Sequence, residues 1–421
     1  MSKFQKVRGM HEVPIEDSLI WSQTIDHLIK IVKSFSYREI RLPILEQTEL
    51  FRRSVGDETD IVNKEMFSFD SKSKKSISLR PEGTAGCMRA SIEQGLLDKG
   101  QQRLFYYGPM YRYERPQKGR NREFYQFSAE AYGNESVYTD FELIQITEKI
   151  ISSLNISNAY LEINSLGSKE CQEKFSKELV KFLTPIKNKL DEDSQKRLNF
   201  NPLRILDSKN LETQSFLQNA PKISDFYSSS SFKKSKDLKK LLDDYGIKYK
   251  ENNKLVRGLD YYNDNVFEWK SDSLGSQNTF CAGGRYDSLS KKLGGRDTPA
   301  VGFSFGVERL ILACKDNFNY QRSKLCNVII LDESFLNLGA NFSDKIRDIF
   351  PSLEVRFSGL DINLKPQLKK AIKNNSNFAI IIGREEVESN SFSFKDLSED
   401  KNQESLSEEE LISKLKELLE K

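Results

Sequence analysis

The chain has 421 residues, of which 65 are Lys or Arg and 62 are Asp or Glu, so its formal net charge is only +3. This length exceeds what one small hydrophobic core organises, and it predicts two or three domains. The near balance of charge excludes a generally basic surface for nucleic acid, but it leaves room for a local cleft that binds phosphate.

The number and placement of cysteine and histidine residues limit the kinds of disulfide, metal site and catalytic site that the chain can form. The five cysteines are scattered without a C-x2-C pair, and the two histidines both lie near the N-terminus. Disulfide frameworks, zinc sites and Cys-His or Ser-His-Asp catalysis are therefore poorly supported. No apolar run reaches membrane-spanning length and the first residues lack a signal-peptide core, so we expect a cytoplasmic protein with no membrane partner.

The first 154 residues pass from helix to strands and back to helix. Residues 17–35 carry apolar side chains at helical spacing and predict an amphipathic helix. Residues 39–51 ("EIRLPILEQTELF") predict a strand that enters a helix through Pro43. Short strands and tight turns are expected over 64–132, and a helix is expected again over 138–154.

The middle of the chain changes character twice. Residues from about 168 to 250 are lysine-rich and helical in pattern, which predicts an inserted helical subdomain. Strand-like sequence resumes at 255–269 ("LVRGLDYYNDNVFEW"), where the Asn-Asp-Asn segment predicts the turn of a hairpin. Residues 300–315 ("AVGFSFGVERLILACK") predict a small-residue strand that passes through Gly306 into an apolar-striped helix.

A second pattern begins near residue 324. Strands such as "NVIIL" and "FAIII" alternate with helices, and Ser407 and Glu410 form a capping box before the last helix. We therefore predict two domains: residues 1–323, which include the helical insertion, and a compact α/β domain over residues 324–421.

Residues 112–127 ("RYERPQKGRNREFYQF") place charged side chains between aromatic ones. Read with the period of a β-strand, Gln126 and Glu130 share one face, while Phe127 and Ala129 occupy the other. The stretch predicts an antiparallel hairpin with one face that packs and one face of charges and amides. By itself this pattern fits either a solvated hairpin or a ligand-binding surface.

Three further stretches place polar groups at element ends or among apolar residues. "LRPEGT" puts Glu82 and Thr84 in a turn after a strand, where a simple helix cap is the alternative interpretation. Arg257 lies in a largely apolar strand, so it either pairs with Asp260 or meets an anionic ligand. Arg309 lies in the first turn of a helix, where a phosphate would relieve its conflict with the helix dipole, unless nearby acids pair with it.

The remaining nucleotide signals are weak or absent. The glycine pair in "AGGRYD" indicates, by itself, only a bulge or a close backbone approach. Neither G-x4-G-K-[ST] nor G-x-G-x-x-G occurs in the sequence, so the common nucleotide cradles are missing. Arg112, Arg257 and Arg309 on an antiparallel sheet offer another way to hold a triphosphate.

Five stretches, taken in order, resemble a known family. "RLPILEQTELFRRSVG", "YRYERPQKGRNREFYQF" and "AVGFSFGVERL" resemble motifs 1, 2 and 3 of the class II aminoacyl-tRNA synthetases. "LVRGLDYYNDNVFEW" and "AGGRYD" are similar to two stretches peculiar to the histidyl-tRNA synthetase family, and "RPEGTAG" fits that family too. The resemblance covers the whole chain, including the insertion and the C-terminal domain.

This resemblance implies a fold and a reaction. The fold is an α+β catalytic domain with a mainly antiparallel sheet flanked by helices, a helical insertion, and a C-terminal α/β anticodon-binding domain. The reaction activates L-histidine with ATP to histidyl-adenylate and transfers it to the 3′ end of tRNA-His for protein synthesis. Mg²⁺ would bridge the phosphates, and the resemblance implies a homodimer with motif 1 at the interface; DNA is not an expected partner.

The resemblance also implies roles for individual residues. Arg112 and Arg257 would be catalytic at the α-phosphate, with Arg309 at the γ-phosphate and Glu114 near the adenine. Gln117 and Arg120 would contact the tRNA acceptor end, and no side chain is expected to be a metal ligand. Histidine would be bound by Glu82, Gly83, Thr84, Gln126, Glu130, Arg257, Tyr261 and Tyr262.

Two other classes of protein share parts of this pattern. A regulatory subunit of ATP phosphoribosyltransferase keeps a histidine pocket, but it typically lacks the C-terminal domain and an intact "LVRGLDYY", both of which are present here. An RNA-binding scaffold without catalysis would be expected to lose Arg112 or Arg257, and both are retained.

Overall fold

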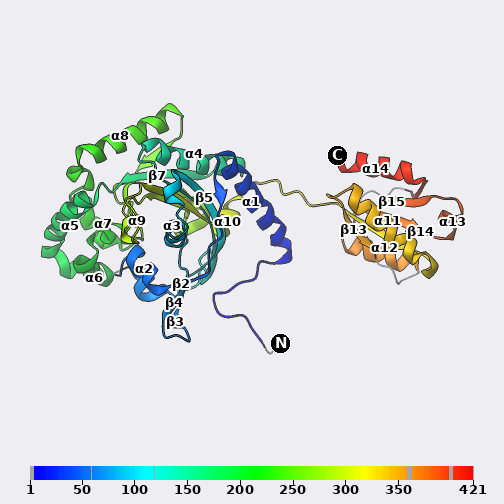
Figure 1. The fold of residues 1–421 in the computed structure, drawn as a ribbon, viewed down its shortest axis with the longest axis horizontal. Helices are drawn as coiled ribbons and strands as arrows, with labels where there is room; N and C mark the ends of the chain where they lie inside the picture. The colour runs from blue at the N-terminus through cyan, green and yellow to red at the C-terminus, as the bar shows by residue number, and fades with distance from the viewer. Residues whose placement is uncertain (1–3, 58, 118, 358–362, 398–401, 421) are drawn as a thin grey trace. The chain divides into compact units, whose positions relative to one another are not determined.

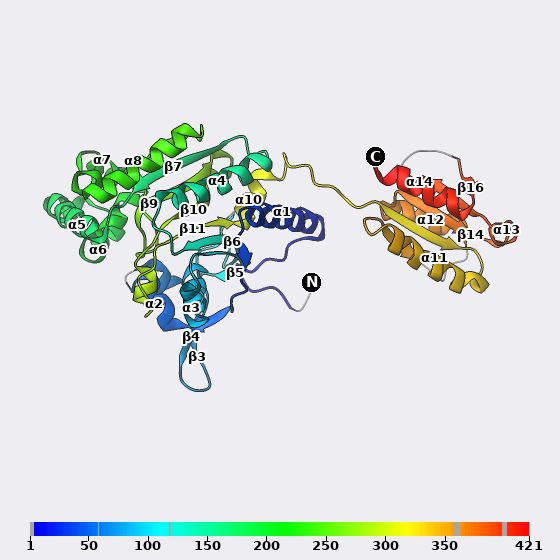
Figure 2. The same ribbon diagram turned by 45° about the horizontal axis from the view of Figure 1, so that its top comes forward.

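The structure is a computed structural model that describes residues 4–57, 59–117, 119–357, 363–397 and 402–420. The chain divides into two compact units, Met1–Asn319 and Tyr320–Lys421, and each unit has its own apolar cores (Figures 1 and 2). Within the described ranges, no helix is long and apolar enough to cross a membrane.

An eight-stranded sheet forms the centre of the first unit. Its strand order is β1-β5-β6-β11-β10-β9-β7-β8, and only the two outermost pairs, β1 with β5 and β7 with β8, are parallel. The sheet is therefore mainly antiparallel, as expected. Its strands are β1 (Arg38–Glu39), β5 (Gln102–Tyr111), β6 (Glu123–Tyr132), β7 (Ala159–Ser165), β8 (Tyr249–Glu251), β9 (Asn263–Ser271), β10 (Thr279–Arg285) and β11 (Ala300–Gly306).

Helices cover one face of this sheet and bury its largest apolar core. Phe127 and Phe303 are almost fully buried on that face, where each contributes about 2 kcal/mol through burial. The predicted helix over 17–35 is present, with Leu28 and Val32 facing the sheet. The covering helices are α1 (Ile15–Ser34), α4 (Val137–Ser153), α8 (Ser229–Asp244) and α10 (Val307–Cys314).

The opposite face carries the insertion and a small second sheet. A core that runs from Tyr106 on β5 to Phe175 and Leu179 of the insertion holds these parts together. Figure 1 shows α5, α6 and α7 gathered at one edge of the unit, while the small sheet, with order β2-β4-β3, projects at another. These elements are β2 (Leu45–Gln47), α2 (Thr48–Val55), β3 (Ser68–Asp70), β4 (Ser76–Leu79), α3 (Thr84–Glu93), α5 (Lys169–Leu183), α6 (Glu192–Phe200), α7 (Leu211–Phe216) and α9 (Leu289–Lys292).

The second unit is a five-stranded mixed sheet with order β13-β12-β14-β15-β16. Helices α11 and α14 pack on one face through Phe342 and Leu411, and α12 covers the other face, where Ile329 and Ile381 are buried. The predicted capping box is present, since Ser407 and Glu410 bond each other's backbone N–H. The elements are β12 (Leu325–Ile330), α11 (Leu336–Ile349), β13 (Glu354–Phe357), α12 (Leu364–Lys373), β14 (Phe378–Ile382), α13 (Arg384–Glu388), β15 (Phe392–Asp396), β16 (Glu404–Leu406) and α14 (Glu408–Glu420).

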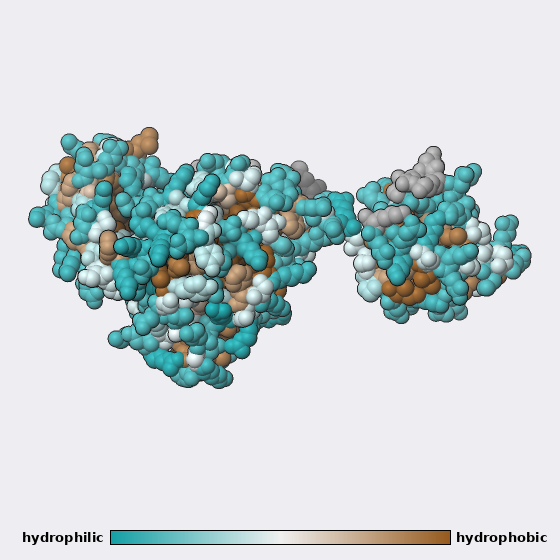
Figure 3. Space-filling view, turned by 90° about the horizontal axis from the view of Figure 1, so that it is seen from above, coloured by the Kyte–Doolittle hydropathy of each residue, from teal (hydrophilic) through white to brown (hydrophobic). Residues whose placement is uncertain are grey.

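The surface seen in Figure 3 is mostly hydrophilic, with separate brown patches rather than one broad apolar face. This agrees with a composition in which 30% of the residues are charged. The low hydrophobic content of the sequence is therefore a property of the surface, because the cores of both units are densely apolar.

One predicted hairpin is wrong. Residues 255–262 form a loop without regular secondary structure, and the Asn-Asp-Asn segment begins strand β9 instead of making a turn. The reason is that these side chains have buried partners. Asp264 accepts a hydrogen bond from Ser231 at 2.9 Å and pairs with Lys234, and the Asn265 amide donates to Asp140 at 3.2 Å. The polar residues that suggested an exposed turn are satisfied inside the sheet.

Candidate active site

A cavity of about 360 Å³ opens on the insertion side of the large sheet. It lies within the size range typical of small-molecule sites. Its walls come from the start of α3, the loop between β5 and β6, strands β6, β9, β10 and β11, the 255–262 loop and α10. Ten of the residues named from the sequence line it: Glu82, Thr84, Arg112, Glu114, Arg120, Gln126, Arg257, Tyr261, Tyr262 and Arg309.

The predicted motif 2 hairpin forms part of this wall. Strands β5 and β6 pair from Gln102 with Tyr132 to Tyr111 with Glu123, so regular pairing ends one residue before Arg112. The expected alternation is present, because Phe127 and Ala129 pack into the apolar core while Gln126 faces the cavity. The polar face is thus a cavity wall, and the solvated-hairpin interpretation is wrong for this stretch.

Four guanidinium groups converge on the cavity. Arg112 donates from Nε to the Pro81 carbonyl at 2.9 Å. Arg309 donates to the carbonyls of Gly119 and Thr279, each at 2.8 Å, and not to the acids near it in sequence. Burial lowers the pKa of Arg309, and the nearby Arg120 and Arg112 lower it further. Cations packed this closely favour a multiply charged anion.

Arg257 differs from the other arginines because it has a carboxylate partner. It forms an ion pair with Glu268 on β9, and not with Asp260 as one interpretation of the sequence required. Burial lowers the pKa of Arg257, but Glu268 and the neighbouring tyrosines outweigh burial, so the pKa is raised overall. Asp260 instead accepts from the Asn201 amide at 2.8 Å.

Glu130 is almost completely buried behind the cavity wall, next to the lining residue Thr84. Its carboxylate accepts hydrogen bonds from Thr84 Oγ1 at 2.9 Å, from the Tyr106 hydroxyl at 2.8 Å, and from the Tyr286 hydroxyl. Burial raises its pKa to about 8, although these three donors act in the opposite direction. Gly302 on β11 faces this carboxylate so closely that a Cβ at that position would collide with it.

Glu82 caps helix α3 as well as lining the cavity. Its two oxygens accept the backbone N–H groups of Thr84 at 2.7 Å and Ala85 at 2.9 Å. Burial raises the pKa of Glu82, and these backbone donors together with Arg112 partly offset that rise. Gly83, between the two predicted residues, packs against the Tyr106 ring, where a side chain would not fit. The helix-cap interpretation and the binding interpretation are therefore compatible.

Tyr261 and Tyr262 are both buried, and their rings lie 4.7 Å apart. The Tyr261 hydroxyl approaches Glu82 at 3.5 Å, and both rings make edge contacts with Tyr286. Tyr286 thus contacts both Tyr262 and Glu130, two of the residues predicted to bind histidine. This aromatic cluster closes the deep end of the cavity.

Gln117 and Arg120, both predicted to contact the tRNA acceptor end, lie in different surroundings on the loop between β5 and β6. Gln117 is exposed, whereas Arg120 lines the cavity and forms an ion pair with Glu114. A two-way backbone bridge between Gln117 and Arg120, with both hydrogen bonds at 2.9 Å, folds the loop back on itself. Of these two residues, Gln117 is the one that faces outward.

Four residues of the site were not identified from the sequence. Glu268 pairs with Arg257, Tyr106 and Tyr286 hold Glu130, and Glu308 accepts the Tyr125 N–H with both oxygens, at 2.9 and 3.1 Å. Burial raises the pKa of Glu308 to about 7. Strand alternation places Glu268 on one face of β9, but which partner it meets depends on the loop that precedes the strand.

Comparison with known proteins agrees with this geometry. A family model described as histidyl-tRNA synthetase matches residues 9–310, and one described as an anticodon binding domain matches residues 328–418. The histidine–tRNA ligase of Buchnera aphidicola subsp. Schizaphis graminum is 46% identical over 420 residues, which are 99% of this chain and 98% of that protein. That of Francisella philomiragia is 43% identical over 422 residues, 99% of this chain and 100% of that protein.

Solved structures show the same relationship. The crystal structure of apo S. aureus histidyl-tRNA synthetase superposes with a TM-score of 0.81 at 30% identity, covering 99% of this chain and 100% of that one. A Bacillus halodurans protein described as an ATP phosphoribosyltransferase regulatory subunit/histidyl-tRNA synthetase gives a TM-score of 0.65 at 20% identity, covering 91% of this chain and 98% of that one. At that identity the likeness concerns the fold alone.

An antiparallel sheet that carries an arginine-lined cavity between motifs 2 and 3 defines a class II aminoacyl-tRNA synthetase. Within that class, the chain belongs to the histidyl-tRNA synthetase family.

Proposed function

We propose that the chain carries out the reaction of its family, ATP-dependent activation of L-histidine followed by transfer to tRNA-His, in the cavity described above. The observation that carries the proposal is the division of that cavity into a cationic half and a buried acidic end. Arginines line the part open to a triphosphate, and at the other end Glu130, buried behind the lining residue Thr84, accepts hydrogen bonds from hydroxyl groups.

The closed end suits the imidazole ring and the α-ammonium group of histidine. We assign Glu130 and Tyr262 to the ring, where a carboxyl oxygen of Glu130 accepts an imidazole N–H. Glu82, Thr84 and Gln126 are assigned to the ammonium group, and Gly83 leaves the room that Tyr106 occupies. A site built to hydrogen-bond a polar side chain rejects analogues that lack it by roughly 10⁴-fold or more.

The cationic half suits phosphoryl transfer. The histidine carboxylate attacks the α-phosphorus of ATP, and pyrophosphate leaves, so the enzyme needs positioned positive charge rather than a nucleophile of its own. We assign Arg112 and Arg257 to the α-phosphate and Arg309 to the γ-phosphate. Glu114, held by Arg120, faces the adenine.

Mg²⁺ is part of the proposal as a companion of ATP, whose phosphate charge it neutralises when bound. Among the described residues, no group of three His, Cys, Asp or Glu side chains is arranged to hold a metal ion. The phosphate oxygens would supply ligands to the ion, while the cavity carboxylates Glu268 and Glu308 are engaged by Arg257 and by the Tyr125 N–H.

The tRNA is assigned to two parts of the chain. Gln117, exposed on the motif 2 loop, is placed to contact the acceptor end, and the unit from residue 320 onward is assigned to the anticodon. This division follows the two-domain prediction, with its boundary near residue 323. The matched anticodon-binding model over 328–418 supports it.

A homodimer and a cytoplasmic location complete the proposal, and both rest on the family resemblance. The motif 1 region supports the dimer, because Ile44 and Leu45 there, and Phe69 on the adjoining small sheet, are exposed apolar side chains. Apolar groups gathered at one surface are typical of a contact between subunits.

The regulatory-subunit alternative shares this fold, so the fold does not separate the two. The separation rests on Arg112, Arg257 and Arg309, which a histidine sensor does not need for its function. Pyrophosphate exchange measured with each of the twenty amino acids tests the proposal: histidine alone should support exchange, and only with Mg²⁺ present. Comparable exchange with another amino acid, or no exchange with histidine, would refute it.

A further inference from the structure

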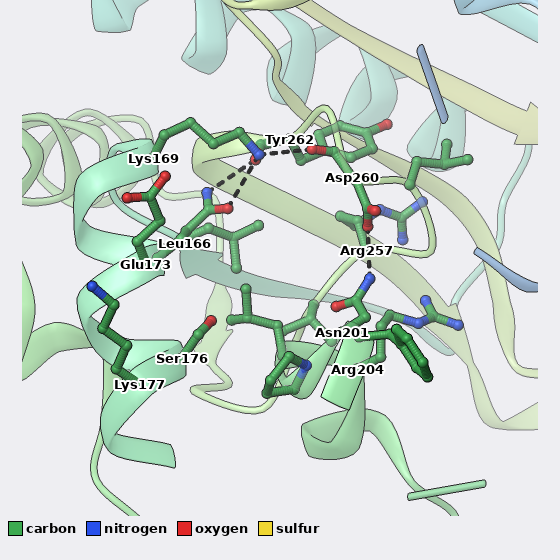
Figure 4. A pocket seen from close by; sticks show the side chains of 16 residues that line it. Leu166, Lys169, Glu173, Ser176, Lys177, Asn201, Arg204, Arg257, Asp260 and Tyr262 are labelled. Atoms are coloured by element: carbon green, nitrogen blue, oxygen red, sulfur yellow. Dashed lines mark hydrogen bonds between the residues drawn. The ribbon is translucent and has the colours of Figure 1, made fainter. Parts of the chain in front are cut away.

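A second cavity, of about 510 Å³, lies on the other side of the 255–262 loop from the active site (Figure 4). Its walls are helix α5, the turn at Pro202–Asp207 and the loop itself. Arg257, Leu259 and Tyr262 line both cavities. The 255–262 loop is therefore the partition between the insertion and the site assigned to histidine.

This loop has no regular secondary structure, so its carbonyl groups depend on donors from elsewhere. Two of those donors are side chains of α5. Lys169 Nζ donates to the Asp260 carbonyl at 2.7 Å, and the buried Gln172 amide donates to the Tyr262 carbonyl at 3.0 Å. Lys169 Nζ also donates to the Gln172 side-chain oxygen at 3.3 Å.

We propose that Lys169 and Gln172 are positioning residues, which hold the backbone of Asp260 and Tyr262 so that the tyrosine rings keep the geometry that reads histidine. The inference rests on the proposed function, because it assigns the insertion a part in amino-acid recognition. A donor lost from a buried carbonyl leaves that carbonyl unsatisfied, and the loop must then move to find another partner.

The catalytic arginine of the same loop is held in a different way. Arg257 pairs with Glu268 on strand β9, which belongs to the sheet and not to α5. The start of the loop is fixed separately as well, since the Asn164 amide donates to the Leu255 carbonyl at 2.9 Å. Loss of the α5 donors should therefore affect histidine recognition more than the chemical step.

Lys169 also gives the arrangement a dependence on pH. Burial lowers its pKa to about 8, with Lys292 of α9 acting in the same direction and Asp260 and Glu173 opposing it. The charged donor to the Asp260 carbonyl is therefore present at neutral pH and is lost as the pH rises through about 8.

The first test compares Gln172→Met and Lys169→Met with the natural protein in histidine-dependent pyrophosphate exchange. We expect the KM for histidine to rise roughly 3- to 10-fold, the worth of one buried hydrogen bond. The KM for ATP and kcat should change less than about twofold by the same scale. Lys177→Met is the matched control, because Lys177 lines the same cavity but extends away from the loop in Figure 4.

The second test uses Lys169→Arg, which keeps its charge at higher pH. Above pH about 8 the KM for histidine should rise more steeply in the natural protein than in the Arg variant. The protonation of free histidine changes with pH in the same way for both proteins, so it cancels when their KM profiles are compared. This comparison also carries the test if a Met variant fails to fold.

The outcomes separate the inference from the proposed function. A natural protein without histidine exchange refutes the proposed function. A natural protein with normal exchange, combined with Met variants that leave the KM for histidine unchanged or that raise both KM values and lower kcat alike, refutes the inference. Identical pH profiles for the natural protein and Lys169→Arg refute it as well.

Discussion

Arg257 forms a partly buried ion pair with Glu268, so the cation assigned to the α-phosphate already has an anionic partner on the neighbouring strand. The pair keeps the guanidinium charged and aimed before the substrate arrives. A preorganised charge of this kind stabilises a transition state without reorganisation at the moment of reaction.

Arg257→Ala should lower adenylate formation by about 10²-fold, equivalent to about 2.7 kcal/mol. Histidine binding should fall less, because the lost interaction is strongest in the transition state. Single-turnover formation of histidyl-adenylate at saturating substrates measures the effect.

Removing Arg257 also takes one partner from Glu268, which keeps Lys270 at 3.4 Å and Thr279 at 2.9 Å, so the stability lost should be below the about 3–5 kcal/mol of a fully unpaired buried ion. The double variant Arg257→Ala, Glu268→Gln separates the two effects: it should recover stability in urea denaturation but not activity. Activity that returns with stability would show that Arg257 acts only through the fold.

Glu130→Gln should change how stability depends on pH. The folded-state pKa of Glu130 is about 8, above its ordinary value of 4.5, so the folded protein holds a proton that the unfolded chain releases. The stability contributed by Glu130 is therefore full below pH about 4.5 and is lost progressively as the pH rises to about 8.

Glutamine does not titrate, so the variant should gain stability relative to the natural protein as the pH is raised from 5 to 8, by at most about 1.4 kcal/mol per pH unit. Urea denaturation at several pH values across that window measures the difference, while histidine exchange should be lost at all of them. Parallel stability curves for the two proteins would mean that Glu130 is ionised throughout.

The motif 2 loop should separate the two reaction steps. Gln117→Ala should lower aminoacylation of tRNA-His while leaving pyrophosphate exchange nearly intact, because the side chain is exposed and lies outside the cavity lining. Arg120→Ala should lower both, since it removes the partner that holds Glu114. Equal loss of both activities in Gln117→Ala would place that residue at ATP rather than at tRNA.

A fragment of residues 1–319 should fold and still form histidyl-adenylate, because its cores and every cavity residue precede the boundary. It should charge tRNA weakly, and the full-length protein should lose tRNA affinity steeply with salt, since phosphate contacts dominate such binding. Charging equal to that of the full-length protein would exclude the second unit as the anticodon reader.

The sequence predicted those features that depend on local pattern. The helix over 17–35, the passage from strand to helix at Gly306 and the capping box at Ser407 were all found, because each is determined by residues within a few positions. Arg257 was singled out because a charge in a largely apolar stretch demands a partner. The motifs identified the family.

What the sequence did not reveal depends on partners from distant segments. One of the two interpretations of Arg257 paired it with Asp260, its neighbour in the chain, but the structure pairs it with Glu268 of β9. No sequence pattern marks Tyr106 or Tyr286 as a site residue. Their hydroxyls meet Glu130 because the folded sheet brings these distant segments together. The Asn-Asp-Asn segment resembled a turn because its buried partners, Ser231 and Asp140, lie outside the stretch.

The glycine at position 302 sets a limit on redesign of the amino-acid pocket. Substrate scope is usually widened by trimming a side chain from the pocket wall, but behind Glu130 the wall is bare backbone, with no atoms left to remove. Trimming the side chains that surround Glu130 instead, Tyr106 or Tyr286, would remove a hydrogen bond that holds its carboxyl group. Enlarging this pocket and keeping its hydrogen-bonding anchor fixed are therefore opposed aims, and an engineer would need to replace the anchor together with the tyrosine.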